Sequence, residues 1–235
     1  MIRLLRALNQ FRKIRTAPEA DRLKYVFWTI AAMGDERYKK TQARYMADMD
    51  FVATITHNPT LTQQINDADS LSKHPEGSLG RLMHEFVHGG EVDYAKFLSQ
   101  YDSAGLNVNG AGVLQVYNTR ERELHDIIHV LFGYERTRFG EAATISTQYW
   151  QGGPSGFAVI SFAGVLRYLF IRPKYGLLVL RALWSAWRRQ VDVDLRGYDF
   201  EKSLHKPVET VKTELGIKPP SKALQTVLAN TRWED

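Results

Sequence analysis

Apolar residues return at helical spacing through most of this chain, and Gly and Pro residues repeatedly interrupt that spacing. The clearest stretch, Leu124 to Phe132, places its apolar side chains on one face at i, i+3, i+4, i+7 and i+8. Strand-like alternation of apolar and polar residues is scarce. We therefore predict an all-α fold in which residues 1–235 form a single-domain, irregular antiparallel helical bundle.

Size and composition agree with a globular protein that has one large core. The chain has 235 residues, of which 44% are hydrophobic and 24% are charged, and these values are ordinary for such proteins. It contains no Cys. This excludes a disulfide framework, a Cys nucleophile and a thiolate metal site.

Local signals set the helix boundaries near the N-terminus. Thr16 is predicted to be an N-cap with Glu19 as its capping-box partner, so a helix should run from Pro18 to Met33. Further helices are predicted over residues 36–55, 91–101 and 141–151.

The helix predicted around residue 127 carries two histidines, His125 and His129, one turn apart on the border of its apolar face. Asp126 lies beside them, and Glu141 follows a Gly-containing connector at a helix start, where the helix dipole favours a carboxylate. Two imidazoles with one or two carboxylates suit Zn, Fe(II) or Mn. We predict that these four residues bind one divalent metal ion, which is Zn, Fe, Mn or Mg.

Two other interpretations of the histidines stay open. A His on the border of an apolar face is more often hydrogen-bonded than metal-bound, and neighbouring Arg residues could pair with the carboxylates on a wet face. A rival motif at residues 84–88, His-Glu-Phe-Val-His, also matches the H-E-x-x-H pattern of zinc metalloproteases. Its context is weaker, because Gly89 and Gly90 follow at once and Tyr94 stands where a third ligand is expected.

The net charge of +5 at pH 7 is unevenly distributed along the chain. Five basic residues precede the first acidic residue, Glu19, and a second basic group lies among apolar and aromatic residues between positions 167 and 189. No DNA-binding or RNA-binding signature accompanies them, so we predict no nucleic-acid partner. An anionic membrane surface explains both features, and residues 1–15 form a basic amphipathic helix that either contacts the membrane or docks on the protein.

Residues 156–171 are almost wholly apolar, and a second apolar stretch covers residues 177–187. The first is shorter than the roughly 20 residues that span a bilayer, and a basic Pro-containing break separates the two. They are either a pair of core helices or core helices that also line a tunnel for a lipid tail. The predicted tunnel residues are Phe157, Ile160, Gly164 and Tyr168.

The candidate metal ligands, H-D-x-x-H followed by eleven residues and E, resemble the signature of the coenzyme Q biosynthesis protein four family. A second match, P-E-G-S-L-G at residues 75–80, lies upstream of the first. The resemblance covers residues 75–185, where it implies a metal-binding and lipid-binding core. It also implies a role in making ubiquinone or a related prenylated quinone.

The resemblance further implies metal-dependent binding and oxidative decarboxylation of a polyprenylated hydroxybenzoate-type intermediate, with the four predicted ligands as catalytic residues. Arg120 and Arg122 are predicted to bind the head group of an isoprenoid-tailed lipid or a prenyl phosphate. Other quinone-biosynthesis enzymes and a second copy of the chain are the implied protein partners. The implied location is the cytoplasmic side of a bacterial membrane or the matrix side of the mitochondrial inner membrane. A non-catalytic lipid-binding scaffold is the alternative function.

Overall fold

The computed structural model describes residues 2–34, 36–89, 112–171, 173–190 and 192–229. Its helices are α1 (Ile2–Thr16), α2 (Glu19–Met33), α3 (Glu36–Met46), α4 (Met49–Ile55), α5 (Leu61–Asn66), α6 (Ala68–Ser72), α7 (Leu79–His88), α9 (Val113–Phe132), α10 (Arg138–Trp150), α11 (Ser155–Ile171), α12 (Pro173–Gln190), α13 (Val208–Glu214) and α14 (Lys222–Leu228). No strand occurs in these ranges, where Ser78 and Pro207 form an isolated antiparallel bridge. The predicted all-α fold is confirmed.

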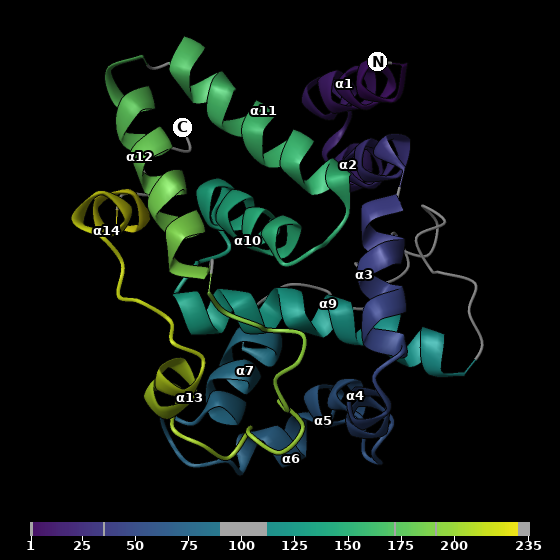
Figure 1. Ribbon diagram of the computed structural model, residues 1–235. Helices are drawn as coiled ribbons and strands as arrows, with labels where there is room; N and C mark the ends of the chain where they lie inside the picture. Colours follow the sequence, from purple (N-terminus) through teal and green to yellow (C-terminus); the bar gives the residue numbers. More distant parts are fainter. Residues whose placement is uncertain (1, 35, 90–111, 172, 191, 230–235) are drawn as a thin grey trace.

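Helix α9 runs through the middle of the molecule, and α4, α5, α7 and α10 pack against it (Figure 1). The apolar face predicted from the spacing is buried, with Leu124, Ile127, Ile128 and Leu131 each 3% exposed or less. Burial of each such side chain stabilises the fold by roughly 2 kcal/mol. The apolar face therefore fixes the rotation of α9 and, with it, the direction of the two histidines on its border.

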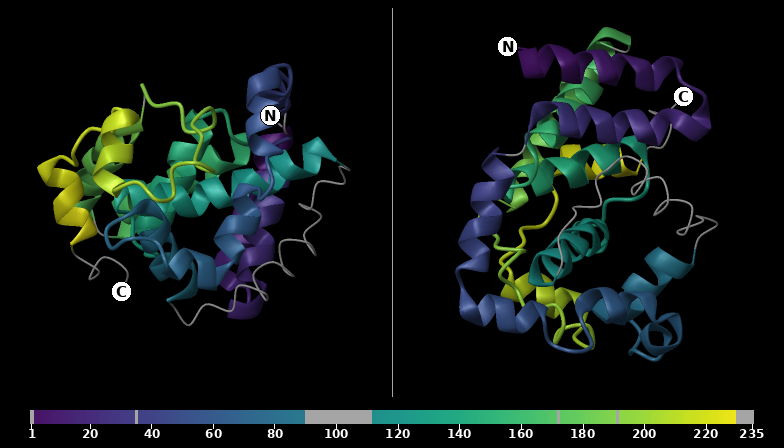
Figure 2. Two further views of the ribbon diagram at one scale, coloured as in Figure 1. Left: turned by 90° about the horizontal axis from the view of Figure 1, so that it is seen from below. Right: turned by 90° about the vertical axis from the view of Figure 1, so that its right-hand side faces the viewer.

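The other helices lie toward two opposite ends of the molecule. At one end, α1 packs on α2, both contact α11, and α12 lies beside α11 (Figures 1 and 2). At the opposite end lie α4, α5, α6 and α13. Helix α10 lies between α9 and the α11–α12 pair, so it connects the centre to the first end.

A glycine sets the distance between α2 and α11. A Cβ atom at Gly156 would lie 2.2 Å from the Ile30 Cα atom and 2.8 Å from its carbonyl oxygen. No side chain fits there, because the atoms in the way belong to the backbone of α2.

Two boundaries predicted from local signals are wrong. Thr16 ends α1 and does not cap α2, whose N-cap is Pro18 without a side-chain hydrogen bond. The helix predicted over 36–55 is divided into α3 and α4 at Asp48, whose carboxylate accepts hydrogen bonds from two backbone N–H groups of α4. An N-cap of this kind starts a new helix in a new direction. The helix predicted over 91–101 lies outside the described residues.

The two apolar stretches form α11 and most of α12. Within the described ranges, no helix combines the length and the hydropathy needed to cross a membrane.

Candidate metal centre

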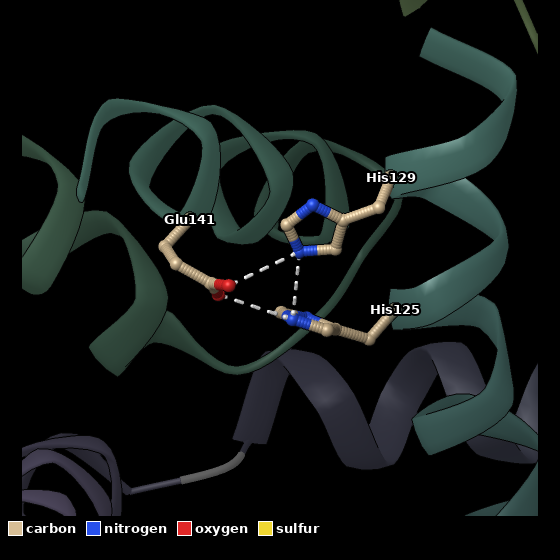
Figure 3. A group of neighbouring side chains, drawn as sticks. All are labelled: His125, His129 and Glu141. Carbon is tan, nitrogen blue, oxygen red and sulfur yellow. Dashed lines mark hydrogen bonds and ion pairs between the residues drawn. The ribbon is translucent and has the colours of Figure 1, made fainter. Parts of the chain in front are cut away.

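Helices α9 and α10 bring together three of the four predicted ligands, His125, His129 and Glu141 (Figure 3). The Glu141 Oε2 atom lies 3.3 Å from Nε2 of His125, and its Oε1 atom lies 3.4 Å from Nε2 of His129. The two Nε2 atoms are 3.2 Å apart. Ligand atoms at about 2.0–2.1 Å from a tetrahedral cation lie about 3.3 Å from one another. The three side chains are therefore spaced as ligands of a single small cation.

The connector between the two helices aims Glu141 at the histidines. Helix α9 ends at Gly133, which adopts the left-handed conformation with φ 67°. Thr137 then caps α10 by accepting a hydrogen bond from the Gly140 N–H group at 3.0 Å. A Cβ atom at position 140 would lie 1.8 Å from the Glu135 carbonyl oxygen, so only glycine permits this tight turn. Glu141 follows in the first turn of α10, where the helix dipole stabilises its charge.

Both imidazoles are held by hydrogen bonds at Nδ1. The His129 Nδ1 atom lies 2.6 Å from the Tyr134 carbonyl oxygen, and the His125 Nδ1 atom lies 2.9 Å from Oε1 of Gln148. The amide nitrogen of Gln148 donates to the Glu121 carbonyl oxygen at 3.2 Å, which orients its oxygen toward the ring. Since both partners are acceptors, Nδ1 carries the proton in each neutral ring, and the Nε2 lone pairs face the common site.

The site is closed on the side of α7 and open near Glu141. The His129 side chain is 1% exposed, and Phe86 of α7 stacks on its ring with centroids 5.1 Å apart. The Arg136 guanidinium lies over the Phe86 ring, 4.2 Å from the ring centre. The side chains of His125 and Glu141 are 26% and 46% exposed. A substrate can therefore reach the cluster from the Glu141 side.

The charges of the cluster shift its acid–base equilibria. Burial alone would lower the pKa of His125, but the hydrogen bond and charge of Glu141, together with Asp126, raise this pKa to about 9. Burial would raise the pKa of Glu141, but hydrogen bonds from His125 and His129 and their charges hold it well below its usual range. The metal-free cluster is thus an ion pair at neutral pH, and a cation must displace the proton of His125.

The chain is similar to known proteins of one family. The sequence profile of the family described as coenzyme Q (ubiquinone) biosynthesis protein Coq4 matches residues 19–221, which include all three ligands. The chain belongs to the Coq4 family. Its relatives include the mitochondrial ubiquinone biosynthesis protein COQ4 homologs of Rattus norvegicus and Mus musculus, each 26% identical over 184 residues. These matches cover 76% of this chain and 64% of each relative, so the chain spans less than two thirds of the length of the curated relatives.

The fold also occurs in a solved structure. The crystal structure of a candidate ubiquinone biosynthesis protein from Nostoc punctiforme superposes with a TM-score of 0.62. The superposition covers 90% of this Coq4-family chain and 96% of the other chain, at 16% sequence identity. At this identity the likeness concerns the helical fold alone.

Asp126, the fourth predicted ligand, lies outside the three-ligand group found in the described residues. Burial raises its pKa, while the positive charges of His125, His129 and Arg136 oppose that rise. Asp126 therefore lies within the electrostatic field of the cluster without supplying an atom to it.

Arg120 and Arg122, predicted to bind a head group, have other partners in the structure. Arg120 is 2% exposed, donates to the Glu201 carboxylate at 2.9 Å, and also donates to backbone carbonyl oxygens in the 196–198 loop. Arg122 donates to the buried carboxylate of Glu123 at 2.7 Å. These contacts give no support to the predicted head-group role. Arg120 ties α9 to the segment from Arg196 to Glu201, whereas Arg122 pairs with its neighbour on the same helix.

The predicted tunnel residues lie on α11, which packs against α10, the helix of Glu141. Phe157 and Ile160 are half-buried, and a Cβ atom at Gly164 would meet no atom within 4 Å. The side chain of Tyr168 is outside the described part of the chain. The tunnel itself stays a prediction.

The H-E-x-x-H motif lies on α7, and no third ligand joins it within the described residues. The rings of His84 and His88 lie against each other at a tilt of 39°, with centroids 5.6 Å apart, and the His88 Nε2 atom lies 2.9 Å from the Ile65 carbonyl oxygen. The Glu85 carboxylate pairs with Arg81 at 3.2 Å. These contacts explain the motif as packing and pairing on one helix, and they leave the metalloprotease interpretation without structural support.

Sequence reasoning missed two residues of the site, Gln148 and Tyr134, which hold the imidazoles. Tyr134 contributes a backbone carbonyl group, for which a sequence holds no side-chain signal. Gln148 follows Glu141 by seven residues, which is two helical turns and the same face of α10. That spacing was the available signal.

Proposed function

We propose that this Coq4-family chain acts in the biosynthesis of ubiquinone or a related prenylated quinone. In this proposal it binds one divalent metal ion and removes the ring carboxyl group of a polyprenylated hydroxybenzoate-type intermediate. Membership of the Coq4 family and the similarity to the rat and mouse ubiquinone biosynthesis proteins support the pathway. The three-ligand group, with both Nδ1 atoms held in place, supports the metal-dependent chemistry.

The residues fit a small divalent cation. Two neutral imidazoles and one carboxylate, with Nε2 and Oε atoms 3.2–3.4 Å apart, form a donor set suited to Zn, Fe(II) or Mn. His125, His129 and Glu141 would hold the ion and leave positions for substrate. The ion would supply Lewis acidity toward the carboxylate or phenolate oxygen of the substrate.

The protein side chains would manage the proton of the reaction. When the bond from the ring to the carboxyl carbon breaks, its electron pair stays on the ring carbon, carbon dioxide leaves, and a proton takes its place. Asp126 would carry that proton, because it is a carboxylate next to His125 that supplies no atom to the three-ligand group. The oxidative form of the reaction puts a hydroxyl group on the same carbon and needs an external two-electron oxidant.

The three-ligand group is the observation that carries this proposal, and two variants test it. His129→Ala and Glu141→Ala should each lose the bound metal, measured by elemental analysis, and should each lose decarboxylation of a carboxylated quinone precursor. His57→Ala, which changes an exposed histidine outside the cluster, is the control. Normal metal content and normal turnover in both ligand variants would refute the proposal.

A non-catalytic lipid-binding scaffold is the second candidate function. The apolar sequence of α11 beside the helix of Glu141 favours it, because such a surface suits an isoprenoid tail. The same preparations decide between the two functions. Native mass spectrometry that finds a bound prenyl lipid, together with no conversion of the carboxylated precursor, would favour the scaffold.

The proposal also concerns location and partners. The rat and mouse relatives are named as mitochondrial. By analogy, the chain would act on the matrix side of the inner membrane in a eukaryote, and on the cytoplasmic side of the membrane in a bacterium. Other quinone-biosynthesis enzymes would hand the prenylated intermediate to it and accept its product, and a homodimer would be its own assembly.

A further inference from the structure

Exposed apolar side chains gather on three helices at one end of the molecule. Eight of the eleven large hydrophobic residues that are exposed in the described ranges belong to α1, α11 and α12. They are Ile2, Leu4, Leu5, Leu8, Phe162, Phe170, Leu177 and Trp184. Because α11 contacts both α1 and α12, these side chains belong to neighbouring helices, and grouped apolar exposure of this kind marks a candidate interaction site.

The same three helices contain no acidic residue. The sequences of α1, α11 and α12 include neither Asp nor Glu, whereas each of them contains Arg and two of them also contain Lys. Apolar exposure and positive charge therefore occur on the same elements. A partner of this surface has to be both apolar and negatively charged.

Helix α12 carries exposed apolar and positively charged side chains along a single stripe. Its exposed residues Leu177, Arg181, Trp184 and Arg188 recur at i, i+4, i+7 and i+11, so they fall on one line along the helix. The Trp184 ring lies against Trp187 with centroids 4.2 Å apart and is still 58% exposed. Apolar and cationic side chains thus alternate along the outer face of α12, as they do in helices that lie in the lipid headgroup layer.

A cleft beside this stripe collects further positive charge. It has a volume of about 430 Å³, and its lining includes Arg181, Trp184, Arg188, Arg189 and Lys218. Arg189 is 6% exposed and donates hydrogen bonds to the backbone carbonyl oxygens of Lys218 and Phe132, which neutralise no charge. Within the described residues, Asp192 is the carboxylate that pairs with this cluster, through Lys218 at 3.2 Å. The cleft therefore keeps an excess of positive charge that suits a phosphate group.

The three helices form one continuous end of the molecule. Helix α1 contacts α11, and α11 contacts α12. Both figures place this end away from α4, α5, α6 and α13 (Figures 1 and 2). Helix α10, which carries Glu141, packs directly on α11 and α12, so this one helix separates the candidate metal centre from the end formed by α1, α11 and α12.

We propose that α1, α11 and α12 form a docking face for an anionic phospholipid bilayer, and that the cleft between α12 and residues 218–223 binds a lipid headgroup phosphate. Leu177, Trp184 and the apolar residues of α1 enter the headgroup layer, while Arg181 and Arg188 contact phosphates. The proposal deepens the proposed function, since an isoprenoid-tailed substrate resides in a bilayer, but its test needs neither metal nor substrate.

Vesicle binding of the full chain tests the charge requirement. Co-sedimentation should show binding to vesicles of phosphatidylcholine with 30% phosphatidylglycerol, and at least about tenfold weaker binding to phosphatidylcholine alone. The double variant Arg181→Glu/Arg188→Glu should lose about tenfold or more of the affinity for the anionic vesicles. Lys39→Glu/Lys40→Glu on α3 makes the same charge change at exposed positions outside the face and should bind as the unchanged protein does.

Tryptophan fluorescence tests the apolar contact. Anionic vesicles should shift the emission to shorter wavelength, and Trp184→Ala should remove most of that shift. Equal binding to both kinds of vesicle, or an equal loss in the α3 control, would overturn the proposal. So would displacement of the vesicles by millimolar inorganic phosphate, which would assign the cleft to a free anion. If the α12 variants instead abolish a concentration-dependent dimer and leave vesicle binding unchanged, the face belongs to a second copy of the chain.

Discussion

The Oε1 atom of Gln148 on α10 accepts a hydrogen bond from the Nδ1–H group of His125 on α9, at 2.9 Å. A flip of the Gln148 amide group, which would exchange its oxygen and nitrogen, would lose the hydrogen bond that its nitrogen donates to the Glu121 carbonyl oxygen. The ring of His125 is therefore held in the tautomer that presents Nε2 to Glu141 and His129. Gln148 thus joins α9 and α10 at the candidate metal centre without belonging to the three-ligand group.

Replacing Gln148 should weaken metal binding without unfolding the protein. Gln148→Ala frees the Nδ1 atom of His125, so we expect about 10-fold to 100-fold weaker Zn²⁺ affinity in competition with a chelator. At a pH above the His125 pKa of about 9, where the metal-free ring is neutral, nitrogen NMR should show the Nδ1–H form alone in the unchanged protein and a mixture of tautomers in the variant. Gln115→Ala, an exposed glutamine on α9, is the matched control. Unchanged affinity and an unchanged tautomer would show that Gln148 has no positioning role.

Metal affinity should rise with pH over an unusually high range. The pKa of His125 in the folded, metal-free protein is about 9, so this ring is protonated at pH 7 and has to release its proton on binding. The apparent affinity should increase about tenfold per pH unit below that value and level off above it. Titrations in buffers of different ionisation enthalpy should detect about one proton released per ion at pH 7.

The cause of this pH dependence can be removed separately. Glu141→Gln deletes the negative charge that raises the pKa of His125, so the ring should titrate at a lower pH in the metal-free variant, as measured by NMR. In the unchanged protein, the charged His125 stabilises the metal-free fold fully below its ordinary pKa of about 6.5, and this contribution is lost as the pH rises through about 9. An unshifted His125 titration in the variant would contradict the assigned cause.

Periodic spacing predicted the helix of the metal centre because burial of one face decides the rotation of a long helix. Leu124 to Phe132 follow that rule, so the positions of His125 and His129 on the border could be predicted. The direction of the Glu141 side chain depends on the tight turn before α10, which the Thr137 cap and the absence of a side chain at Gly140 make possible. Partners that lie far away in the chain had no local signal. Glu201, which pairs with Arg120 across 81 residues, is one of these.

The same limit explains the two boundary errors and the position of Asp126. Asp is favoured at an N-cap over a helix interior, but no Gly or Pro next to Asp48 marked a break there, so the prediction continued one helix through it. Asp126 and His125 are neighbours in sequence, yet their side chains leave α9 about 100° apart. Of these two neighbours, His125 alone belongs to the three-ligand group.

Glu123 should make the stability of the fold depend on pH. Its side chain is fully buried, and burial raises its pKa to about 7 although Arg122 lies 2.7 Å away and lowers it. Because this pKa exceeds the ordinary value of 4.5, the stabilisation is complete below pH 4.5 and is lost as the pH rises through about 7. Glu123→Gln should remove that loss and raise the unfolding free energy at pH 8 by roughly 1–3 kcal/mol.

Urea denaturation at pH 5 and pH 8 measures this effect. The loss of unfolding free energy between pH 5 and pH 8 should be larger in the unchanged protein than in the Glu123→Gln variant. Glu85→Gln is the control, since Glu85 is an exposed carboxylate paired with Arg81. If Glu123→Gln lowers stability equally at both pH values, the buried carboxylate is instead needed as a charged partner of Arg122.

Two glycines of α11 should respond in opposite directions to the same substitution. A Cβ atom at Gly156 would lie 2.2 Å from the Ile30 Cα atom, so Gly156→Ala has to push α2 away from α11 and should cost about 1–3 kcal/mol of unfolding free energy. A Cβ atom at Gly164 meets nothing within 4 Å, so Gly164→Ala should gain about 0.5–1 kcal/mol through helix propensity. Urea midpoints with unchanged slopes measure both values. A destabilising Gly164→Ala would mean that the space beside α11 is filled in solution. If that space is the predicted lipid path, Gly164→Leu should retain the fold and lose the bound prenyl lipid in native mass spectrometry.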